Sequence, residues 1–374
     1  MDDILRLYFE KPEVETLATP YLPDRHRIDS QLIEDNFAVA IIGVGSDTNA
    51  LTNKGSAAAP DAVRRQLYSL RGNLNLQLAD LGNLKKGKGL NDTFFALKDT
   101  VAELTEKRIV PIVIGGSQDL TLPMFNGLKE RGGQINLTVV DSRIDLGDGG
   151  TDFNSHSFLQ PIIDDAQLDQ FEPLCYQSYF VPDDCLAWLK KRQGDFGVRL
   201  GIARSKLPNL EPYLRDTDLL SVDMSAVRQA DAPAHALATP NGLFAEEAAQ
   251  LMLYAGYADR VKALGLFELN PQFDNNEESA ATAAQMIWHF LEGASKRAGD
   301  FPVRPIEGYA KYVVQQRGEK NIEFVFYNNP ANDRWWLEVP IANEQKRIVA
   351  CTFDDYNFTK AGGLPERWMR FYLK

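Results

Sequence analysis

Polar side chains that could do chemistry follow several short apolar runs of the sequence, where each run ends. The runs are rich in Val, Ile and Leu, which is typical of strands buried on both faces of a parallel sheet. In such a sheet, ligands bind at the carboxyl ends of the strands. These side chains are Gln118, Asp141, Arg143, Asp145, Asp223 and Glu268, and a loop after Asp145 adds Asn154, Ser155 and His156. The sequence therefore predicts one crevice that holds several carboxylates.

Carboxylates that share a crevice repel one another. They are stable together when a cation or an arginine lies between them, or when their pKa values rise. Asp141, Asp145 and Asp223 supply three negative charges, and Arg143 supplies one positive charge. The predicted chemistry is therefore cation binding or acid–base catalysis. Taken alone, Asp141 and Asp145 could also form a surface turn.

The elements that must position these residues alternate between strand-like and helix-like patterns. Helical repeats cover Phe94–Leu104, Ala245–Tyr257 and Ser279–Leu291, with the first capped at Asp92 or Thr93. This alternation predicts a three-layer α/β/α fold with a mostly parallel, eight-stranded sheet. The strand-like runs are Phe37–Gly43, Leu76–Leu81, Val110–Ile114, Leu137–Asp141, Tyr176–Phe180, Val198–Ile202, Leu219–Val222 and Ala263–Glu268.

A different pattern begins after Gly293, where the segment KRAGDFPVRP carries two prolines. Three strand-like runs follow, at Ile322–Tyr327, Arg334–Val339 and Arg347–Phe353. We predict an α/β domain over residues 1–300 and a small β-rich extension over residues 301–374, packed on or beside the core. The Trp residues of the extension are expected to be buried in this packing; if exposed, they would mark an interface.

The overall composition narrows the classes of protein. Hydrophobic residues make up 44% of the 374 residues and charged residues 25%, as in ordinary globular chains. The formal net charge of −12 argues against nucleic acid as a partner. We expect a cytoplasmic protein without a membrane partner, because the sequence has neither a secretory signal pattern nor an apolar run of membrane length.

Several segments, taken in order, resemble the ureohydrolase family of arginases, agmatinases and formimidoylglutamases, and formimidoylglutamase most closely. PIVIGGSQDLTLPMF is similar to the family's GGDHSLTLP stretch, and VVDSRIDL is similar to its DAHxD segment. LLSVDMSAVRQADAPAHALATPNGL resembles SxDxDxxDPxxAPGxxxPxPGGL, and GLFELNPQFDN resembles its E-x-N-P element. The similarity covers most of residues 30–295. It implies the arginase fold and hydrolysis of guanidino or formimino compounds by a water that two manganese ions activate.

The resemblance implies six metal ligands, of which this chain keeps three. Asp141, Asp145 and Asp223 match, whereas the remaining three positions, two His and one Asp in the family, carry Gln118, Arg143 and Ser225. Gln118 and the three Asp could hold one Mn²⁺, Mg²⁺ or Ca²⁺ through oxygen atoms, or no ion.

The second ion of the family has no equivalent ligand set in this chain. Arg143 is always protonated and cannot coordinate a metal. We therefore predict no dinuclear manganese site. We expect the Arg143 guanidinium, together with Ser225, to take the second ion's place and to pair with Asp141 and Asp223. Arg143→Ala is then expected to lower the stability by a few kcal/mol.

The resemblance also suggests roles for the remaining polar residues. His156 matches the loop histidine that assists proton transfer, and Glu268 matches the glutamate that engages the cationic nitrogen of the substrate. With Asp145 they are the candidate catalytic residues, and Asn154 and Ser155 are candidates for substrate binding. His235 is expected to be exposed to solvent.

Three functions remain open from the sequence. The first is a protein with an eroded metal site and without ureohydrolase activity, which keeps a pocket for a small guanidino, formimino or amino-acid ligand. The second is an active amidine hydrolase that uses one metal ion or none. The third is an assembly or regulatory partner, and in any of these roles the chain could form a homo-oligomer.

Overall fold

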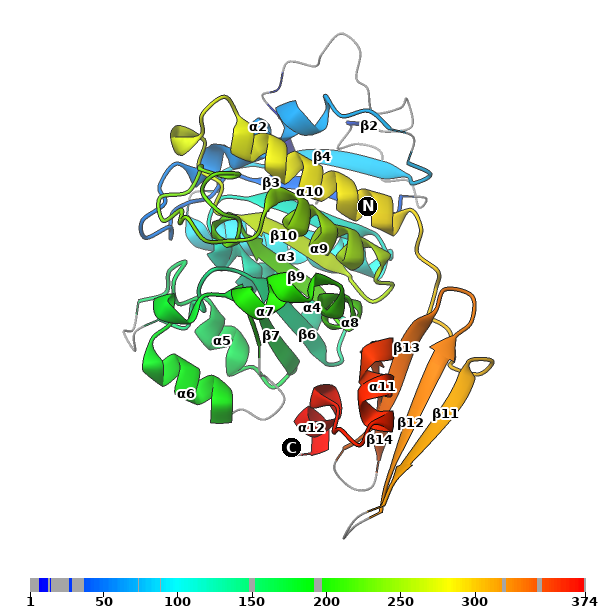
Figure 1. The fold of residues 1–374 in the computed structure, drawn as a ribbon. Coiled ribbons are helices and arrows are strands. Elements are labelled where there is room, and N and C mark those ends of the chain that lie inside the picture. Colours follow the sequence, from blue (N-terminus) through cyan, green and yellow to red (C-terminus); the bar gives the residue numbers. More distant parts are fainter. Residues whose placement is uncertain are drawn as a thin grey trace.

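The structure is a computed structural model that describes residues 7–12, 14, 27–28, 37–72, 74–87, 89–147, 152–191, 197–317, 321–341 and 345–372. A large twisted sheet runs through the upper body of the molecule, and a smaller sheet lies beside it (Figure 1). Among the described residues, no helix has the length and apolar character required to cross a bilayer.

The large sheet has the strand order β1-β4-β3-β5-β10-β9-β6-β7-β8, with β2 also pairing with β4. The eight strands from β4 to β8 along this path are parallel, as predicted, and two-residue β1 is antiparallel to β4. The strands are β1 (Phe9–Glu10), β2 (Arg27–Ile28), β3 (Val39–Val44), β4 (Leu78–Leu84), β5 (Val110–Gly115), β6 (Ile135–Val140), β7 (Leu168–Tyr176), β8 (Val198–Arg199), β9 (Leu219–Asp223) and β10 (Ala263–Phe267).

Two strand predictions at the β7–β8 edge were wrong in their bounds. The run Tyr176–Phe180 lies mostly past β7, because the chain turns into a short 3₁₀ segment at Ser178–Phe180. Alternating polar residues in LDQFEPLCY concealed β7 itself. The run Val198–Ile202 is a strand only over Val198–Arg199, since a helix begins at Leu200.

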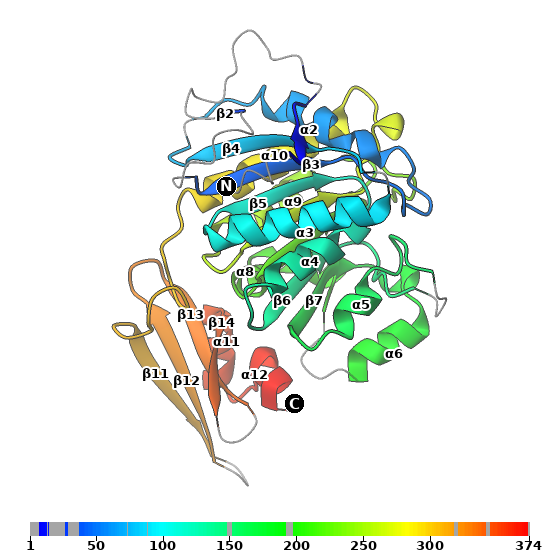
Figure 2. The same ribbon diagram turned by 180° about the vertical axis from the view of Figure 1, so that it is seen from behind.

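Helices cover both faces of the large sheet (Figures 1 and 2). One face carries α2 (Ala59–Leu67), α9 (Ala245–Tyr257) and α10 (Glu278–Ala294), and the other carries α3 (Leu90–Glu106), α4 (Thr121–Lys129) and α5 (Leu159–Ile163). The remaining helices of this body are α6 (Asp183–Lys191), α7 (Leu200–Ser205) and α8 (Glu211–Arg215).

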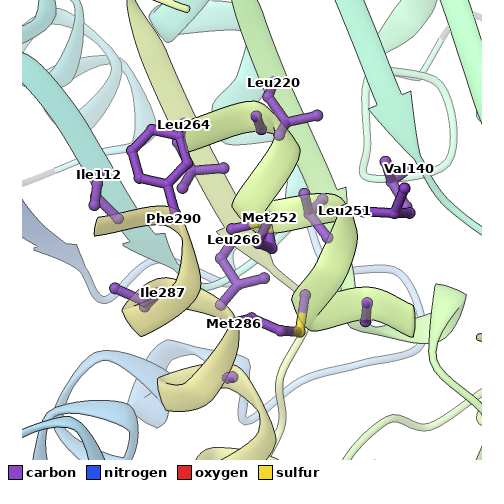
Figure 3. Close-up of a cluster of buried hydrophobic side chains, with 14 of the residues drawn as sticks. Ile112, Val140, Leu220, Leu251, Met252, Leu264, Leu266, Met286, Ile287 and Phe290 are labelled. Carbon is purple, nitrogen blue, oxygen red and sulfur yellow. The ribbon is translucent and has the colours of Figure 1, made fainter. Parts of the chain in front are cut away.

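Each face of the sheet has its own apolar core. Figure 3 shows Leu264 and Leu266 of β10 packed against Met286, Ile287 and Phe290 of α10. All five side chains are at most 2% exposed. A buried side chain of this size contributes about 1.5–3 kcal/mol through removal of its apolar surface from water, so these layers dominate the stability of the fold.

Helix α3 begins earlier than its sequence suggested. The predicted caps, Asp92 and Thr93, lie inside the first turn, and the capping residue is Gly89. The Asp92 carboxylate instead accepts a hydrogen bond from the Gly89 N–H at 3.2 Å, as an acidic residue at the third helical position does in a capping box.

The small antiparallel sheet has the order β11-β12-β13-β14 and is covered by two helices. Trp335, Trp336 and Trp368 are at most 6% exposed, so the expectation that they are buried is confirmed. The predicted domain boundary at residue 300 stays a prediction. These elements are β11 (Ala310–Gln316), β12 (Ile322–Asn329), β13 (Arg334–Pro340), β14 (Lys346–Cys351), α11 (Phe353–Lys360) and α12 (Glu366–Tyr372).

A buried arginine of α8 ties the small sheet to the large body. The Arg215 guanidinium is 4% exposed and donates to the carbonyl oxygens of Trp335 at 3.0 Å and Cys351 at 3.1 Å. Asp216, the next residue, accepts from the Ala350 N–H and from Arg367. The extension is therefore held by buried polar contacts as well as by apolar packing.

Candidate functional site

The candidate site lies where four neighbouring strands of the large sheet end. In the sheet order, β10 lies between β5 and β9, and β6 follows β9. The carboxyl ends of these strands therefore bring together Gln118, Asp141, Asp145, Asp223 and Glu268, which are at most 8% exposed. Oxygen atoms of the three Asp lie within 4.8 Å of one another, close enough for one cation to bind all three.

One oxygen of Asp141 and one of Asp223 are covered by hydrogen-bond donors. Asp141 Oδ1 accepts from the Arg143 N–H at 2.8 Å and from the Ser225 hydroxyl at 3.0 Å. Asp223 Oδ1 accepts from the Ser225 N–H at 2.6 Å, and His235 Nε2 lies 3.5 Å from the same oxygen. The donors therefore gather on one side of the two carboxylates.

The other oxygens, Asp141 Oδ2 and Asp223 Oδ2, face the Gln118 amide. Two orientations of this amide, related by a half turn, fit the surroundings. In one, Nε2 donates to the two Oδ2 atoms at 3.2 and 3.3 Å. In the other, Nε2 donates to Ser221 Oγ at 3.1 Å, and Oε1 joins the two carboxylate oxygens. Three oxygens facing one another are favourable around a cation or when one of the carboxyl groups holds a proton, so the amide can adapt to either state.

Asp145 depends on Asp141 for its side-chain hydrogen bond. The residue is only 8% exposed, and its carboxyl group hydrogen-bonds that of Asp141, which requires a proton on one of the two. Two buried carboxyl groups this close are unfavourable unless they share a proton or bind a cation. Asp145 therefore requires either a proton or a cation in this site.

The burial of the site raises the pKa of each of its carboxyl groups. Burial, with the nearby Asp223 charge, raises the pKa of Asp141 to about 7 and that of Glu268 to about 8. Burial raises the pKa of Asp223 to about 6. The pKa of Asp145 lies well above its ordinary value because of burial and the charges of Asp141 and Asp223. Without a cation, the site therefore holds protons at neutral pH.

Arg143 does not lie between the carboxylates, which corrects the expected pairing. The guanidinium is half-buried, stacks on the Phe180 ring with 4.5 Å from its central carbon to the ring centre, and donates to Ser142 Oγ at 3.0 Å. Ser142 Oγ and Ser225 Oγ are 2.8 Å apart, and Ser225 donates to Asp141. Two serine hydroxyls thus connect the guanidinium to Asp141. Arg143 still lines the crevice, and its charge partly offsets the rise that burial causes in the pKa values of Asp141 and Asp223.

Glu268 is fixed by partners from two distant segments. Its carboxylate accepts from the Gln118 N–H and from Asn53 Nδ2, both at 2.8 Å. Its backbone has φ of 63°, a conformation that is rare for residues other than glycine and that often marks a functional site. Asn53 also accepts from the Ala236 N–H at 3.0 Å, so it joins the loop after β9 to the end of β10. No motif or spacing in the sequence had singled out Asn53.

The crevice that these residues line is small, with room for about one water molecule, about 10 Å³. Thr52, Ser155 and His156 line it beside the carboxylates, whereas Asn154 is absent from its lining. The Asn154 side chain instead accepts from the His156 N–H and donates to the Asp152 carbonyl, which shapes the loop. The pKa of His156 is lowered by burial and by Arg143.

His235 also lines this crevice, although its sequence context predicted exposure. The residue is 7% exposed, because the chain after β9 folds back over the strand ends. Its Nδ1 atom accepts from the Leu237 N–H at 2.8 Å, and burial lowers its pKa to about 4. His235 lies in the segment that resembles the family's SxDxD element, but at a position to which that pattern assigns no ligand, so the sequence did not indicate its burial here.

The site offers oxygen atoms on one side of the carboxylates. Asp145, the Oδ2 atoms of Asp141 and Asp223, and Gln118 Oε1 are oxygen ligands of the kind that Mg²⁺, Ca²⁺ and Mn²⁺ prefer. The opposite side carries backbone N–H groups and a guanidinium, which cannot coordinate a cation, and the Ser225 hydroxyl, which donates to Asp141.

An α/β/α fold with aspartates at the ends of β6 and β9 defines the class of ureohydrolase-like proteins. The chain belongs to the arginase family, because the Arginase family model matches residues 37–176 and 204–292. The predicted resemblance is thereby confirmed.

Individual relatives point to one branch of this family. A formimidoylglutamase of Cupriavidus pinatubonensis is 24% identical over 277 residues, which are 67% of this chain and 85% of that protein. Among solved structures, Trypanosoma cruzi formiminoglutamase with Mn²⁺ has a TM-score of 0.65 at 23% identity and covers 70% of this chain and 94% of its own. Bacillus subtilis formimidoylglutamase has a TM-score of 0.66 at 20% identity, and the match covers 73% of this chain and 91% of that protein. These structures confirm the arginase-like fold.

Proposed function

We propose that this chain is a formimidoylglutamase-like member of the arginase family that has lost the dinuclear manganese centre and binds at most one divalent cation. It then has no ureohydrolase turnover of the two-metal kind. A small ligand with a guanidino, formimino or amino-acid group would bind in its crevice only after the loops over the crevice move, because the crevice has room for about one water molecule.

This proposal rests on which carboxylate oxygens of the site already accept hydrogen bonds and which do not. Asp141 and Asp223 would each have to use both oxygens to bridge two ions. Their Oδ1 atoms accept from Arg143 N–H and from Ser225, which leaves only the Oδ2 atoms for a cation. Asp145 would complete the set with Gln118.

The chemistry of such a site would differ from that of the family. A single cation, when bound, would supply charge neutralisation and modest polarisation of a bound oxygen, since three carboxylates largely offset its charge. Asp141 and Asp223 would remain oriented by their Oδ1 partners. Glu268, held by Gln118 and Asn53, would present its free lone pairs to a cationic nitrogen of a ligand.

Metal content and Mn²⁺ titration of the purified protein test the proposal. We expect one weakly held ion or none, by elemental analysis and by calorimetry. Two tightly held ions per chain would contradict it. Formiminoglutamate, agmatine and arginine, added in turn, should raise the melting temperature without release of product. Arg65→Ala, on the surface of α2, serves as a folded control for these measurements.

A second function is favoured by the neighbourhood of His156 and Glu268. Both line the crevice with the three Asp. Burial lowers the pKa of His156 and raises the pKa of Glu268 to about 8. An amidine hydrolase with one ion or none could use them for proton transfer. Turnover of formiminoglutamate that disappears in His156→Ala and Glu268→Gln would select this function over the first.

A further inference from the structure

His235 enters the site from the loop after β9 and faces the side of Asp223 that carries donors. Its Nε2 atom lies 3.5 Å from Asp223 Oδ1, and both residues are at most 7% exposed. The segments in which the sequence resembles the family's metal-binding motifs do not assign this histidine a role. It comes to the centre only because the loop packs over the ends of the strands.

The backbone fixes which ring nitrogen of His235 carries the proton. The Leu237 N–H donates to Nδ1 at 2.8 Å, so Nδ1 presents a lone pair. In a neutral imidazole the other nitrogen, Nε2, then carries the hydrogen. A protonated nitrogen cannot coordinate a metal ion. His235 therefore presents an N–H group to the carboxylates rather than a ligand.

We infer that His235 is a fourth determinant that keeps a second cation out of the site, in addition to the three replaced ligands. This inference rests on the proposed single-cation function. The imidazole N–H faces Asp223 Oδ1, which is the oxygen a second ion would need. A cation there would meet the positive end of the N–H bond and the ring itself. Restoration of the family's ligands alone is then insufficient to rebuild the pair of ions.

Two variants of the full-length chain test this inference. The first carries Gln118→His, Arg143→His and Ser225→Asp, which restores the ligand types of the family. The second adds His235→Ala. We expect the triple variant to bind one Mn²⁺ per chain and the quadruple variant to bind two, by elemental analysis and calorimetric titration. Electron paramagnetic resonance should show an isolated Mn²⁺ in the first and a magnetically coupled pair in the second.

Two further variants guard against misfolding and against a general effect of losing a histidine. His235→Asn keeps an oxygen that can accept from the Leu237 N–H, so it replaces His235→Ala if the latter does not fold. His289→Ala removes a histidine of α10 that is 39% exposed and contacts Glu292. Added to the triple variant, it should leave the binding of one ion unchanged.

The possible results separate this inference from the proposed function. Two ions in the triple variant would overturn the role of His235, as would a single ion in folded quadruple variants of both kinds. Two ions in the unaltered protein would instead contradict the proposed function itself. Absence of bound Mn²⁺ from the unaltered, triple and quadruple proteins alike would overturn both the role of His235 and the assignment of the ligand positions.

Discussion

The Ser225 hydroxyl donates to Asp141 Oδ1 at 3.0 Å, which joins the turn after β9 to the end of β6. These two strands are parallel neighbours in the sheet, so residues 84 positions apart meet at one edge. The adjacent carboxylate is thereby satisfied by a neutral hydrogen-bond donor. In the proposed function, this serine takes the place of an aspartate ligand of the family pattern.

Asp145→Asn is expected to stabilise the protein in the presence of a chelator. The Asp145 carboxyl group is buried beside Asp141 and Asp223 and hydrogen-bonds Asp141 only while one of the two holds a proton, whereas a neutral amide carries no charge to desolvate. We expect a gain of about 1–2 kcal/mol in the free energy of unfolding at pH 8, measured by urea denaturation. The same change should weaken Mn²⁺ binding by about tenfold or more, because an acidic ligand is lost. Asp99→Asn, at an exposed carboxylate, should change neither quantity.

The cation-free protein is expected to lose stability as the pH rises from about 4 to about 8. The pKa values of Asp223, Asp141 and Glu268 in the folded protein are about 6, 7 and 8, above the value of about 4 in an unfolded chain. The folded state therefore binds more protons in this interval, and its stability falls as they leave.

Denaturation with a chelator at several pH values measures this loss. Saturating Mn²⁺ should reduce the loss, since a cation replaces the departing protons. Stability that rises over this interval without a cation would show that the carboxyl groups are ionised throughout.

Arg143→Ala is expected to lower the stability by only about 1 kcal/mol. Within the part of the chain that the structure describes, the side chain hydrogen-bonds Ser142 and stacks on Phe180, and each of these contacts is worth about 1 kcal/mol or less. This value is below the few kcal/mol that direct pairing with buried carboxylates predicted. Thermal and urea unfolding measure the difference, with Arg65→Ala as the surface control. A loss above about 3 kcal/mol would restore Arg143 as the counter-charge of the site.

Asn53→Ala is expected to lower the free energy of unfolding by about 2–3 kcal/mol. Asn53 is 2% exposed, and its loss would leave the Glu268 carboxylate and the Ala236 N–H without their partner. It should also weaken the thermal stabilisation by an amidine ligand, because Glu268 would lose its orientation. Asn209→Ala, whose side chain makes no hydrogen bond within the described residues, is the matched control. Equal stability of the two variants would show that Asn53 does not fix Glu268.

The sequence by itself determined the class of fold and the main residues of the site. Buried parallel strands can be recognised from unbroken runs of Val, Ile and Leu in the local sequence, because such a strand needs apolar side chains on both faces. The acidic residues that follow such runs could therefore be placed at one edge of the sheet. Asp141, Asp145, Asp223 and Glu268 indeed meet there.

The tertiary structure decided which atoms of these residues remain available. Asp141 and Asp223 each have one covered oxygen, Arg143 turns to Phe180, and Asn53 and His235 enter from loops. None of this follows from periodicity or motif spacing. The direction of a side chain in a turn depends on packing between segments that lie far apart in the chain, and the choice between ligand and hydrogen-bond partner depends on that direction.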